Sequence, residues 1–314
     1  MKHKVQQAVR VFAPATVANV AVGYDILGFA LESPGDEVIA RISDTPGITI
    51  SKIHGTKKSL PKDPTKNTAT VGALALLKDL GKEDIGIEIE LFKKMPFGSG
   101  MGSSAASAAA GVMAVNELLG RPVAKRSLAK YAVIGEAAAD GAIHGDNVIP
   151  SLVGGMVLIR DNDSYDYLKL PVPPGLFAFV IYPEIEILTK DARAVLSDQV
   201  TLSKLIAQTG NIASFVSSLY TSDLELMSRS LKDHVIEEQR AQLIPHFYDM
   251  QDIALRNGAM NYTISGAGPS MFGFAINTII AEEASNAIQA HLQSKNIASH
   301  VYISQVNKTG SYKM

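Results

Sequence analysis

The sequence contains no cysteine among its 314 residues. Without thiols the chain can form neither disulfides nor thiolate metal sites, and it has no cysteine nucleophile. Its basic residues are scattered, with no block of the kind that neutralises a nucleic-acid backbone, and the formal net charge is −2. We therefore expect no nucleic-acid partner and a small-molecule substrate.

Long apolar segments are also missing. The longest extends from Ala105 to Val115, which is too short to cross a bilayer and contains Ser107. Gln6, Gln7 and Arg10 interrupt the N-terminal segment where a signal peptide would carry its apolar region. These absences predict no membrane partner and, with the lack of cysteine, a cytoplasmic location.

The composition is that of an ordinary globular protein, with 46% hydrophobic and 19% charged residues. Because 314 residues exceed what one hydrophobic core usually organises, we expect two domains. The Pro-rich segment at 171–174 is the best candidate boundary, which gives domains at residues 1–170 and 171–314. The order of strands and helices predicts two α+β domains that meet at a cleft.

The spacing of apolar residues predicts the elements of each domain. In the first domain it predicts strands at 5–12, 36–42, 48–53 and 85–91, helices at 70–80, 103–119 and 127–139, and a hairpin whose turn is 161–164. In the second it predicts strands at 176–182, 263–265, 271–275 and 301–305, a mostly helical segment at 202–231 and a helix at 281–293.

The segment from Pro96 to Ser107 has three glycines in five residues, followed by serines and an Ala-rich helix. Glycines let a backbone turn tightly and approach a ligand closely. The first N–H groups of the helix have no intrahelical partner and, with the positive end of its dipole, bind anions. We interpret the segment as a phosphate-binding loop, against the alternative of a well-capped structural helix. The expected phosphate contacts are Pro96, Gly98, Ser99, Gly100, Met101, Gly102, Ser103, Ser104 and Ser107.

Two familiar phosphate motifs do not fit this loop. A Walker A loop ends in Gly-Lys-Ser/Thr, and no lysine follows these glycines. The dinucleotide fingerprint requires a third glycine where this chain has Ser103. A nicotinamide-dependent dehydrogenase is therefore disfavoured.

Three segments together resemble the signatures of the GHMP kinase superfamily. The loop is similar to its P-x-x-x-G-L-G-S-S-A-A motif, with Met101 at the usual leucine, and residues 265–270 resemble its third, Gly-rich motif. Residues 13–28 resemble the substrate motif of the homoserine kinase family, with Ala-Val-Gly-Tyr-Asp at 21–25 where that family has G-P-G-F-D. Residues 144–150, 189–193 and 233–245 resemble further segments of that family, in the same order.

This resemblance implies a fold and a reaction. The fold would combine an N-terminal domain like ribosomal protein S5 domain 2 with a ferredoxin-like C-terminal domain. The reaction would transfer the γ-phosphoryl group of ATP to the side-chain hydroxyl of L-homoserine, in threonine biosynthesis. By the resemblance, Ser104 and Glu136 supply oxygen ligands to Mg²⁺, and Asn67 lies beside the nucleotide.

The resemblance also implies residues for the acceptor, which carries a carboxylate, an ammonium and a hydroxyl. Arg193 and Arg240 would clamp the carboxylate with their guanidinium forks, and Asp25 would hold the ammonium. The expected substrate contacts are Asn19, Asp25, Asn147, Thr189, Arg193 and Arg240. The residues expected to act in catalysis are Ser104, Glu136, Asn147 and Arg193.

The general base stays open at this point. Asn147 stands where mevalonate kinase-like relatives have an aspartate, and an amide cannot take a proton. The resemblance therefore implies catalysis by alignment and charge stabilisation, with Asp146 as an alternative base. His144 is expected to be structural.

Two other functions are compatible with the same motifs. One is another GHMP kinase, acting on mevalonate, a sugar or shikimate; the other is a non-catalytic ligand sensor on the same scaffold. Such sensors tend to lose metal ligands, whereas this chain has both Ser104 and Glu136. A homodimer is an open alternative to a monomer.

Overall fold

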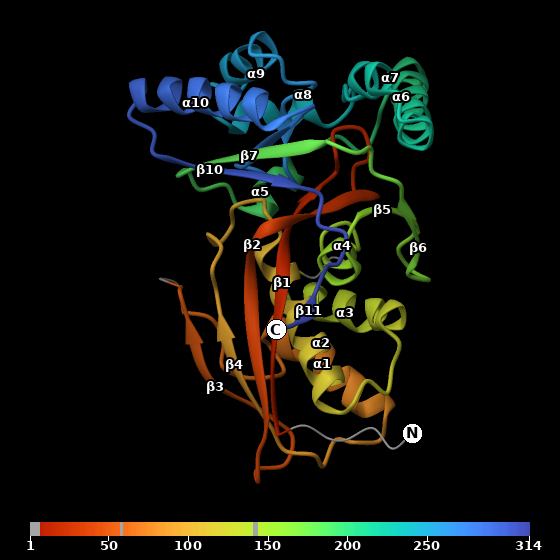
Figure 1. Ribbon diagram of the computed structural model, residues 1–314, viewed down its shortest axis with the longest axis vertical. Helices are drawn as coiled ribbons and strands as arrows, with labels where there is room; N and C mark the ends of the chain where they lie inside the picture. Colours follow the sequence, from red (N-terminus) through yellow and green to blue (C-terminus); the bar gives the residue numbers. More distant parts are fainter. Residues whose placement is uncertain (1–6, 57–58, 141–143) are drawn as a thin grey trace.

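The computed structural model of the chain describes residues 7–56, 59–140 and 144–314, without the side chains of residues 139, 140 and 189. Within these residues the chain forms two β-sheets, each covered by helices. Figure 1 shows the first sheet and its helices in the lower part and the second sheet above them. Among the helices described, none combines the length and the apolar character that a membrane span requires.

The first sheet has seven strands. They are β1 (Ala8–Ala18), β2 (Leu27–Ile42), β3 (Ile48–His54), β4 (Ile87–Phe92), β5 (Met156–Asp161), β6 (Asp166–Leu170) and β11 (Tyr312–Lys313). Their order is β11-β1-β2-β4-β3, with β5 paired to the start of β2 and β6 paired to β5. Only β3 and β4 are parallel. Ile87, Ile89 and Leu91 are buried and alternate with partly exposed residues, as their spacing predicts.

Helices cover one face of this sheet (Figure 1). They are α1 (Thr68–Asp79), α2 (Ser103–Leu118), η1 (Lys125–Leu128), α3 (Ala129–Asp140) and α4 (Val148–Val153). The Ala-rich α2 lies in the middle and contacts β1, β2, α1, α3 and α4. Every residue of α2 except Ser104 is buried. Small side chains permit this close packing: a Cβ added at Gly111 would lie 1.7 Å from the carbonyl oxygen of Ala69 on α1.

The second sheet is antiparallel and has the order β10-β7-β9-β8. Its strands are β7 (Phe177–Pro183), β8 (Thr263–Ile264), β9 (Met271–Ala275) and β10 (Ser299–Gln305). The helices α9 (Phe247–Arg256) and α10 (Thr278–Ser294) lie on its outer side (Figure 1). With helices between β7 and β8 and between β9 and β10, the order is that of a ferredoxin-like domain. The implied C-terminal fold is thus confirmed.

Between β7 and β8 the chain forms several further helices. They are α5 (Thr189–Ala194), α6 (Leu202–Thr221), α7 (Leu224–Ser230), α8 (Glu237–Arg240) and η2 (Ala241–Leu243). The segment predicted as mostly helical at 202–231 is divided in two. Ser222 adopts a left-handed φ of 55°, which ends α6, and the Asp223 side chain accepts a hydrogen bond from the N–H of Leu226 and begins α7.

The strand predicted at 36–42 is much longer in the structure. β2 begins at Leu27 and passes through Ser33-Pro34-Gly35, three residue types that are common in turns. The register between β1 and β2 shifts between Pro14 and Thr16, opposite this region. A proline, which donates no ladder hydrogen bond, is tolerated at such an irregularity.

The two sheets are in direct contact. The Phe29 ring of β2 lies 5.8 Å from that of Phe272 and 5.2 Å from that of Phe274, both on β9. The chain then returns to the first sheet after β10, where β11 pairs with β1 in the register Val11 to Lys313. The strand predicted at 301–305 is therefore followed by another. These contacts fix how the two sheets face each other.

Candidate active site

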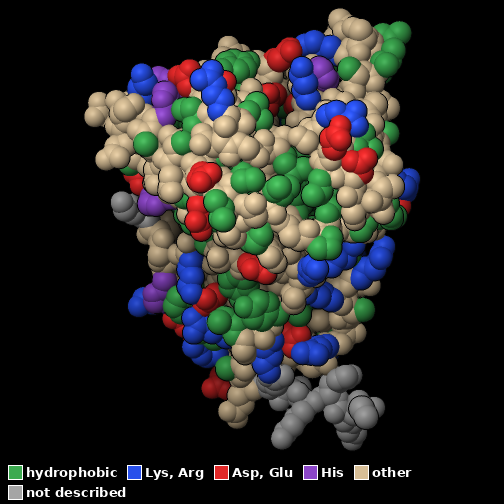
Figure 2. Space-filling view, turned by 45° about the horizontal axis from the view of Figure 1, so that its top comes forward, with side chains coloured by type: hydrophobic (Ala, Val, Ile, Leu, Met, Phe, Trp, Pro, Cys, Tyr) green, Lys and Arg blue, Asp and Glu red, His purple; other side chains and the backbone are tan. Residues whose placement is uncertain are grey.

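A pocket of about 820 Å³ opens between the two sheets. The first sheet and its helices contribute the glycine loop and acidic side chains, and the second contributes the segment 184–188, two arginines and the turn Gly266–Gly268. Its volume lies within the range of small-molecule sites. On the face shown in Figure 2, acidic and basic side chains lie interspersed.

The loop owes its shape to its glycines. Gly98, Gly100 and Gly102 have left-handed φ angles of 66°, 78° and 66°, which cost other residues free energy. A Cβ added at Gly102 would lie 2.1 Å from Thr16 Oγ1, and one added at Gly100 would lie 2.6 Å from the carbonyl oxygen of Ser265. The loop is therefore held against β1 and against the third Gly-rich turn.

A buried ion pair lies behind the loop. Lys93, whose side chain is 5% exposed, pairs with the fully buried Asp36 of β2. Lys93 Nζ also donates hydrogen bonds of 2.7 Å to the carbonyl oxygen of Ser103 and to Ser107 Oγ. This cluster anchors the first turn of α2. In the sequence, Lys93 and Lys94 after a strand look like surface lysines, so no signal there indicates the pair.

Two of the expected phosphate contacts lie behind the loop. Met101 is fully buried, and Ser107 is 1% exposed and donates a hydrogen bond to Asp36 Oδ2 at 2.8 Å. Neither lines the pocket. The side chains of both support the loop from the core side.

Ser104 and Glu136 meet at the edge of the pocket. Ser104 lies in the first turn of α2, Glu136 lies on α3, and Ser104 Oγ donates a hydrogen bond of 2.7 Å to Glu136 Oε1. Both residues line the pocket. A hydroxyl and a carboxylate are hard oxygen donors of the kind that Mg²⁺ takes, so this pair fits the expected ion.

Asp25 lines the same pocket. Its Oδ2 is 3.7 Å from Arg193 Nη1 and 3.4 Å from His144 Nδ1. Its backbone N–H donates a hydrogen bond to Asn19 Oδ1, and Asn19 Nδ2 donates to the carbonyl oxygen of Gly266. Asn19 therefore connects the substrate motif of the first sheet to the turn of the second.

Arg240 is 3% exposed and lines the same pocket. Its guanidinium donates to the carbonyl oxygens of Ala192 and Gly266 and to the Tyr24 hydroxyl, and lies 5.0 Å above the Tyr24 ring. Burial lowers the pKa of Arg240 and raises that of Tyr24. These bonds use three of its five N–H groups, which leaves one on each terminal nitrogen.

Asp146 and Asn147 line the pocket between the loop and Asp25. Asp146 is 3% exposed, and its burial, together with the charges of Asp25 and Glu136, raises the pKa of its carboxyl to about 7. Asn147 Oδ1 accepts a hydrogen bond of 2.8 Å from Thr16 Oγ1. The amide thereby keeps its NH₂ group for a ligand.

Most of the residues expected from the sequence come together here. Those that line the pocket are Asn19, Asp25, Pro96, Gly98, Ser99, Gly100, Gly102, Ser103, Ser104, Glu136, Asn147, Arg193 and Arg240. Asn67 does not. It caps α1, accepting from the N–H of Ala69 and donating to the carbonyl oxygen of Pro61, so its contact with a nucleotide stays a prediction. Thr189 begins α5, and its side chain lies outside the described part of the chain.

Comparison with protein families gives two matches. Residues 67–155 match the GHMP kinases N terminal domain, and residues 215–294 match the GHMP kinases C terminal domain. The first span includes the glycine loop, Ser104 and Glu136, and the second includes Arg240 and the turn at Gly266. Both matched spans therefore contribute to the pocket.

The chain is also similar to curated proteins over nearly its full length. It is 44% identical to a homoserine kinase of Chlorobium phaeovibrioides over 316 residues, which cover 97% of this chain and 99% of that protein. It is 42% identical to a homoserine kinase of Chloroherpeton thalassium over 311 residues, which cover 96% and 97% of the two chains.

Among solved structures, the crystal structure of homoserine kinase from Cytophaga hutchinsonii has a TM-score of 0.96 and 47% identity, covering 99% of this chain and 98% of that one. The mevalonate kinase of L. major in complex with R-mevalonate has a TM-score of 0.73 at 14% identity, covering 98% and 99%. The second likeness concerns the fold alone.

Proposed function

Because this chain belongs to the homoserine kinases of the GHMP kinase family, we propose that its pocket phosphorylates the side-chain hydroxyl of L-homoserine. ATP is the phosphoryl donor, and the product O-phospho-L-homoserine belongs to threonine biosynthesis. The protein has the two-domain GHMP kinase fold. The residue roles below are our proposal for how the pocket performs this reaction.

One observation carries the assignment of roles. Anion-binding backbone and paired charges occur in the same pocket, which is lined both by the glycine loop and by Asp25, Arg193 and Arg240. Homoserine has a carboxylate for the arginines and an ammonium for Asp25. An acceptor such as mevalonate or a sugar has no ammonium for Asp25 to bind.

The phosphate site acts by positioning. We assign the N–H groups from Gly98 to Ser104, at the positive end of the α2 dipole, to the phosphates of ATP. Ser104 and Glu136 would hold Mg²⁺, which supplies charge neutralisation on the transferred phosphoryl group when bound. The anchors behind the loop keep these donors in place, so the alignment requires no reorganisation during the reaction.

The acceptor site orients the hydroxyl. Arg193 and Arg240 fix the carboxylate, Asp25 fixes the ammonium, and the Asn147 NH₂ group orients the hydroxyl oxygen. The hydroxyl proton has two routes: onto an oxygen of the phosphoryl group, or onto Asp146, whose pKa of about 7 suits an acceptor. Asp146→Asn separates them, because only the second route requires this carboxylate.

A coupled assay of ADP release tests the function. Purified protein with Mg²⁺ and ATP would be compared with L-homoserine, mevalonate, galactose, shikimate and no acceptor. We expect turnover that depends on L-homoserine alone. Turnover with another acceptor would support kinase activity but contradict our assignment of the substrate-binding residues. ATP binding without any turnover would favour a ligand sensor.

We further propose a division into domains at residues 1–170 and 171–314, which separates β6 from β7. In this division β11 belongs to the second segment although it joins the first sheet.

We propose a cytoplasmic location, where ATP is plentiful, and no partners beyond the two substrates. A homodimer stays open, and sedimentation at micromolar concentration would decide it.

A further inference from the structure

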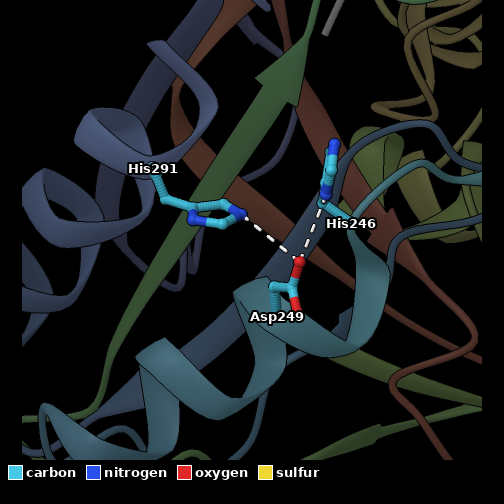
Figure 3. Close-up of side chains that lie close together, drawn as sticks. All are labelled: His246, Asp249 and His291. Carbon is cyan, nitrogen blue, oxygen red and sulfur yellow. Dashed lines mark hydrogen bonds and ion pairs between the residues drawn. The ribbon is translucent and has the colours of Figure 1, made fainter. Parts of the chain in front are cut away.

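Two histidines and an aspartate converge on the outer side of the second sheet, away from the glycine loop. His246 Nδ1 lies 3.2 Å and His291 Nε2 lies 3.5 Å from Asp249 Oδ2. Figure 3 shows both rings directed toward the one carboxylate. In the part of the chain that the structure describes, no other three His, Cys, Asp or Glu side chains gather in this way.

The three side chains come from two helices that pack together. His246 is the N-cap of α9, with a left-handed φ of 61°, and Asp249 lies in the first turn of α9. His291 lies in the last turn of α10. The positive end of α9 favours the ionised carboxylate, and the negative end of α10 favours a cation beside His291. The dipoles of both helices are therefore compatible with a carboxylate-bound cation at their junction.

His291 supplies a second, independent observation. Its side chain is 20% exposed, but its Nε2 atom is buried and has no hydrogen-bond partner among the described residues. At 3.5 Å it faces Asp249 Oδ2 without forming a hydrogen bond. Buried polar atoms are rarely left unsatisfied, and an ion is one of the usual reasons where they are.

The distances fit coordination by a single small ion. Zn²⁺ binds imidazole nitrogen at about 2.0–2.1 Å and carboxylate oxygen at about 2.0–2.2 Å, so two tetrahedral ligands lie about 3.3 Å apart. The two N···O distances of 3.2 and 3.5 Å bracket that value. All three ligand atoms lie within 4.8 Å of one another, so small side-chain rotations would complete the geometry.

We propose that His246, Asp249 and His291 bind one divalent transition-metal ion, with water as the fourth ligand. Two imidazoles and one carboxylate suit Zn²⁺ and its neighbours Co²⁺ and Ni²⁺, whereas Mg²⁺ prefers oxygen ligands alone. The ion joins the start of α9 to the end of α10. It is separate from the ion expected at Ser104 and Glu136, both in place and in chemistry.

Titration of the full-length protein with Co²⁺, without nucleotide, tests the proposal. We expect one Co²⁺ per chain, with the intense visible absorption of tetrahedral coordination, and displacement of this signal by Zn²⁺. His291→Ala and His246→Ala should each weaken binding by about tenfold or more, because outer partners of a metal site alone are worth 10–100-fold. His54→Ala is the matched control, since His54 pairs with one carboxylate, Glu90, and no third ligand lies beside it among the described residues; this variant should bind Co²⁺ as the unaltered protein does.

Glu136→Gln distinguishes this site from the kinase pocket. If Glu136→Gln still binds Co²⁺, the proposal is supported. If Glu136→Gln loses Co²⁺ binding while His291→Ala keeps it, the proposal is overturned. Absence of Co²⁺ binding would overturn it too.

Thermal unfolding gives a second readout. Zn²⁺ at a hundredfold excess over its Kd should raise the Tm by about 5 °C. At the same Zn²⁺ concentration the increase should fall to about half or less in His291→Ala and in Asp249→Asn, because their weaker sites are less saturated. Asp249→Asn preserves the shape of the side chain. An equal increase in these variants would contradict binding at this place.

Discussion

Lys93 pairs with Asp36 directly behind the glycine loop, and both side chains are buried. Lys93 joins the end of β4 to the first turn of α2 through the carbonyl oxygen of Ser103. Lys93 also lines the pocket, and its hydrogen bond to Ser103 helps to fix where the N–H groups of α2 point. We therefore expect stability and nucleotide binding to be coupled at this position.

The first prediction concerns this pair. Lys93→Met leaves Asp36 buried without its cation, so the free energy of unfolding should fall by about 3–5 kcal/mol, and the KM for ATP should rise as the loop loses its anchor. Lys94→Met is the control, because Lys94 is half exposed and its buried partner Glu37 keeps a second cation, Arg10; its cost should be about 1 kcal/mol. Urea unfolding of both variants measures the difference, and equal losses would contradict the role of Lys93.

The second prediction concerns the Mg²⁺ ligands. Glu136→Gln removes the carboxylate charge that would hold the ion, so kcat should fall by about a hundredfold and half-saturation should require more Mg²⁺. Asp79→Asn is a matched control, since Asp79 is an exposed carboxylate that also accepts from a hydroxyl, that of Tyr131. Initial rates across Mg²⁺ concentrations measure both variants. An unchanged Mg²⁺ dependence in Glu136→Gln would remove Glu136 from the metal site.

The third prediction separates the two arginines. Arg193→Lys keeps the charge but loses the fork, so the KM for homoserine should rise about tenfold with little change in stability. Arg240→Lys should raise the same KM and also cost about 2–3 kcal/mol, because the carbonyl oxygens of Ala192 and Gly266 lose donors. Arg256→Lys, at an exposed ion pair with Asp252, should change neither quantity. Steady-state kinetics and urea unfolding provide the measurements, and unchanged KM values in both pocket variants would exclude a carboxylate clamp.

The fourth prediction follows from the pKa of Asp146. The folded chain keeps the proton of this carboxyl up to about pH 7, whereas the unfolded chain loses it near its ordinary value of 3.8. Between these values the folded state binds one more proton, so the free energy of unfolding falls as pH rises from about 4 to 7.

Asp146→Asn removes that dependence. At pH 8 the variant should be more stable than the unaltered protein, by roughly 2–4 kcal/mol at most. The difference should disappear at the acidic end of the window, where both side chains are neutral. Chemical unfolding at several pH values between 4 and 8 measures this difference. If the variant is less stable than the unaltered protein at pH 8, the ionised Asp146 carboxylate does not destabilise the folded state.

The loop could be predicted from the sequence because its determinants are local. Glycines at 98, 100 and 102 have the left-handed φ angles that their spacing suggests, and the alanines after them form a buried helix. The pattern at Ile87, Ile89 and Leu91 works in the same way, since alternation along one strand requires no knowledge of its neighbours.

What the sequence missed depends on distant contacts. Lys93 becomes a buried anchor only because Asp36, 57 positions earlier, lies beneath it on the adjacent strand. β2 continues through Pro34 because β1 opposite has an irregular register. Likewise, nothing near His246 in the sequence indicates that His291 of another helix will lie beside it. Such positions require the fold before their chemistry can be seen.

The return of the chain to its first sheet has a consequence for its synthesis. β1 is flanked on one side by β2 and on the other by residues 312–313, and Lys125 Nζ holds this returning segment through the carbonyl oxygens of Thr309 and Ser311. A ribosome thus makes residues 8–18 about three hundred residues before their second neighbour. During that interval the edge of β1 at Val11 and Phe12 can accept a strand from another nascent chain, and β11 covers this part of the edge only after residue 313 has left the ribosome.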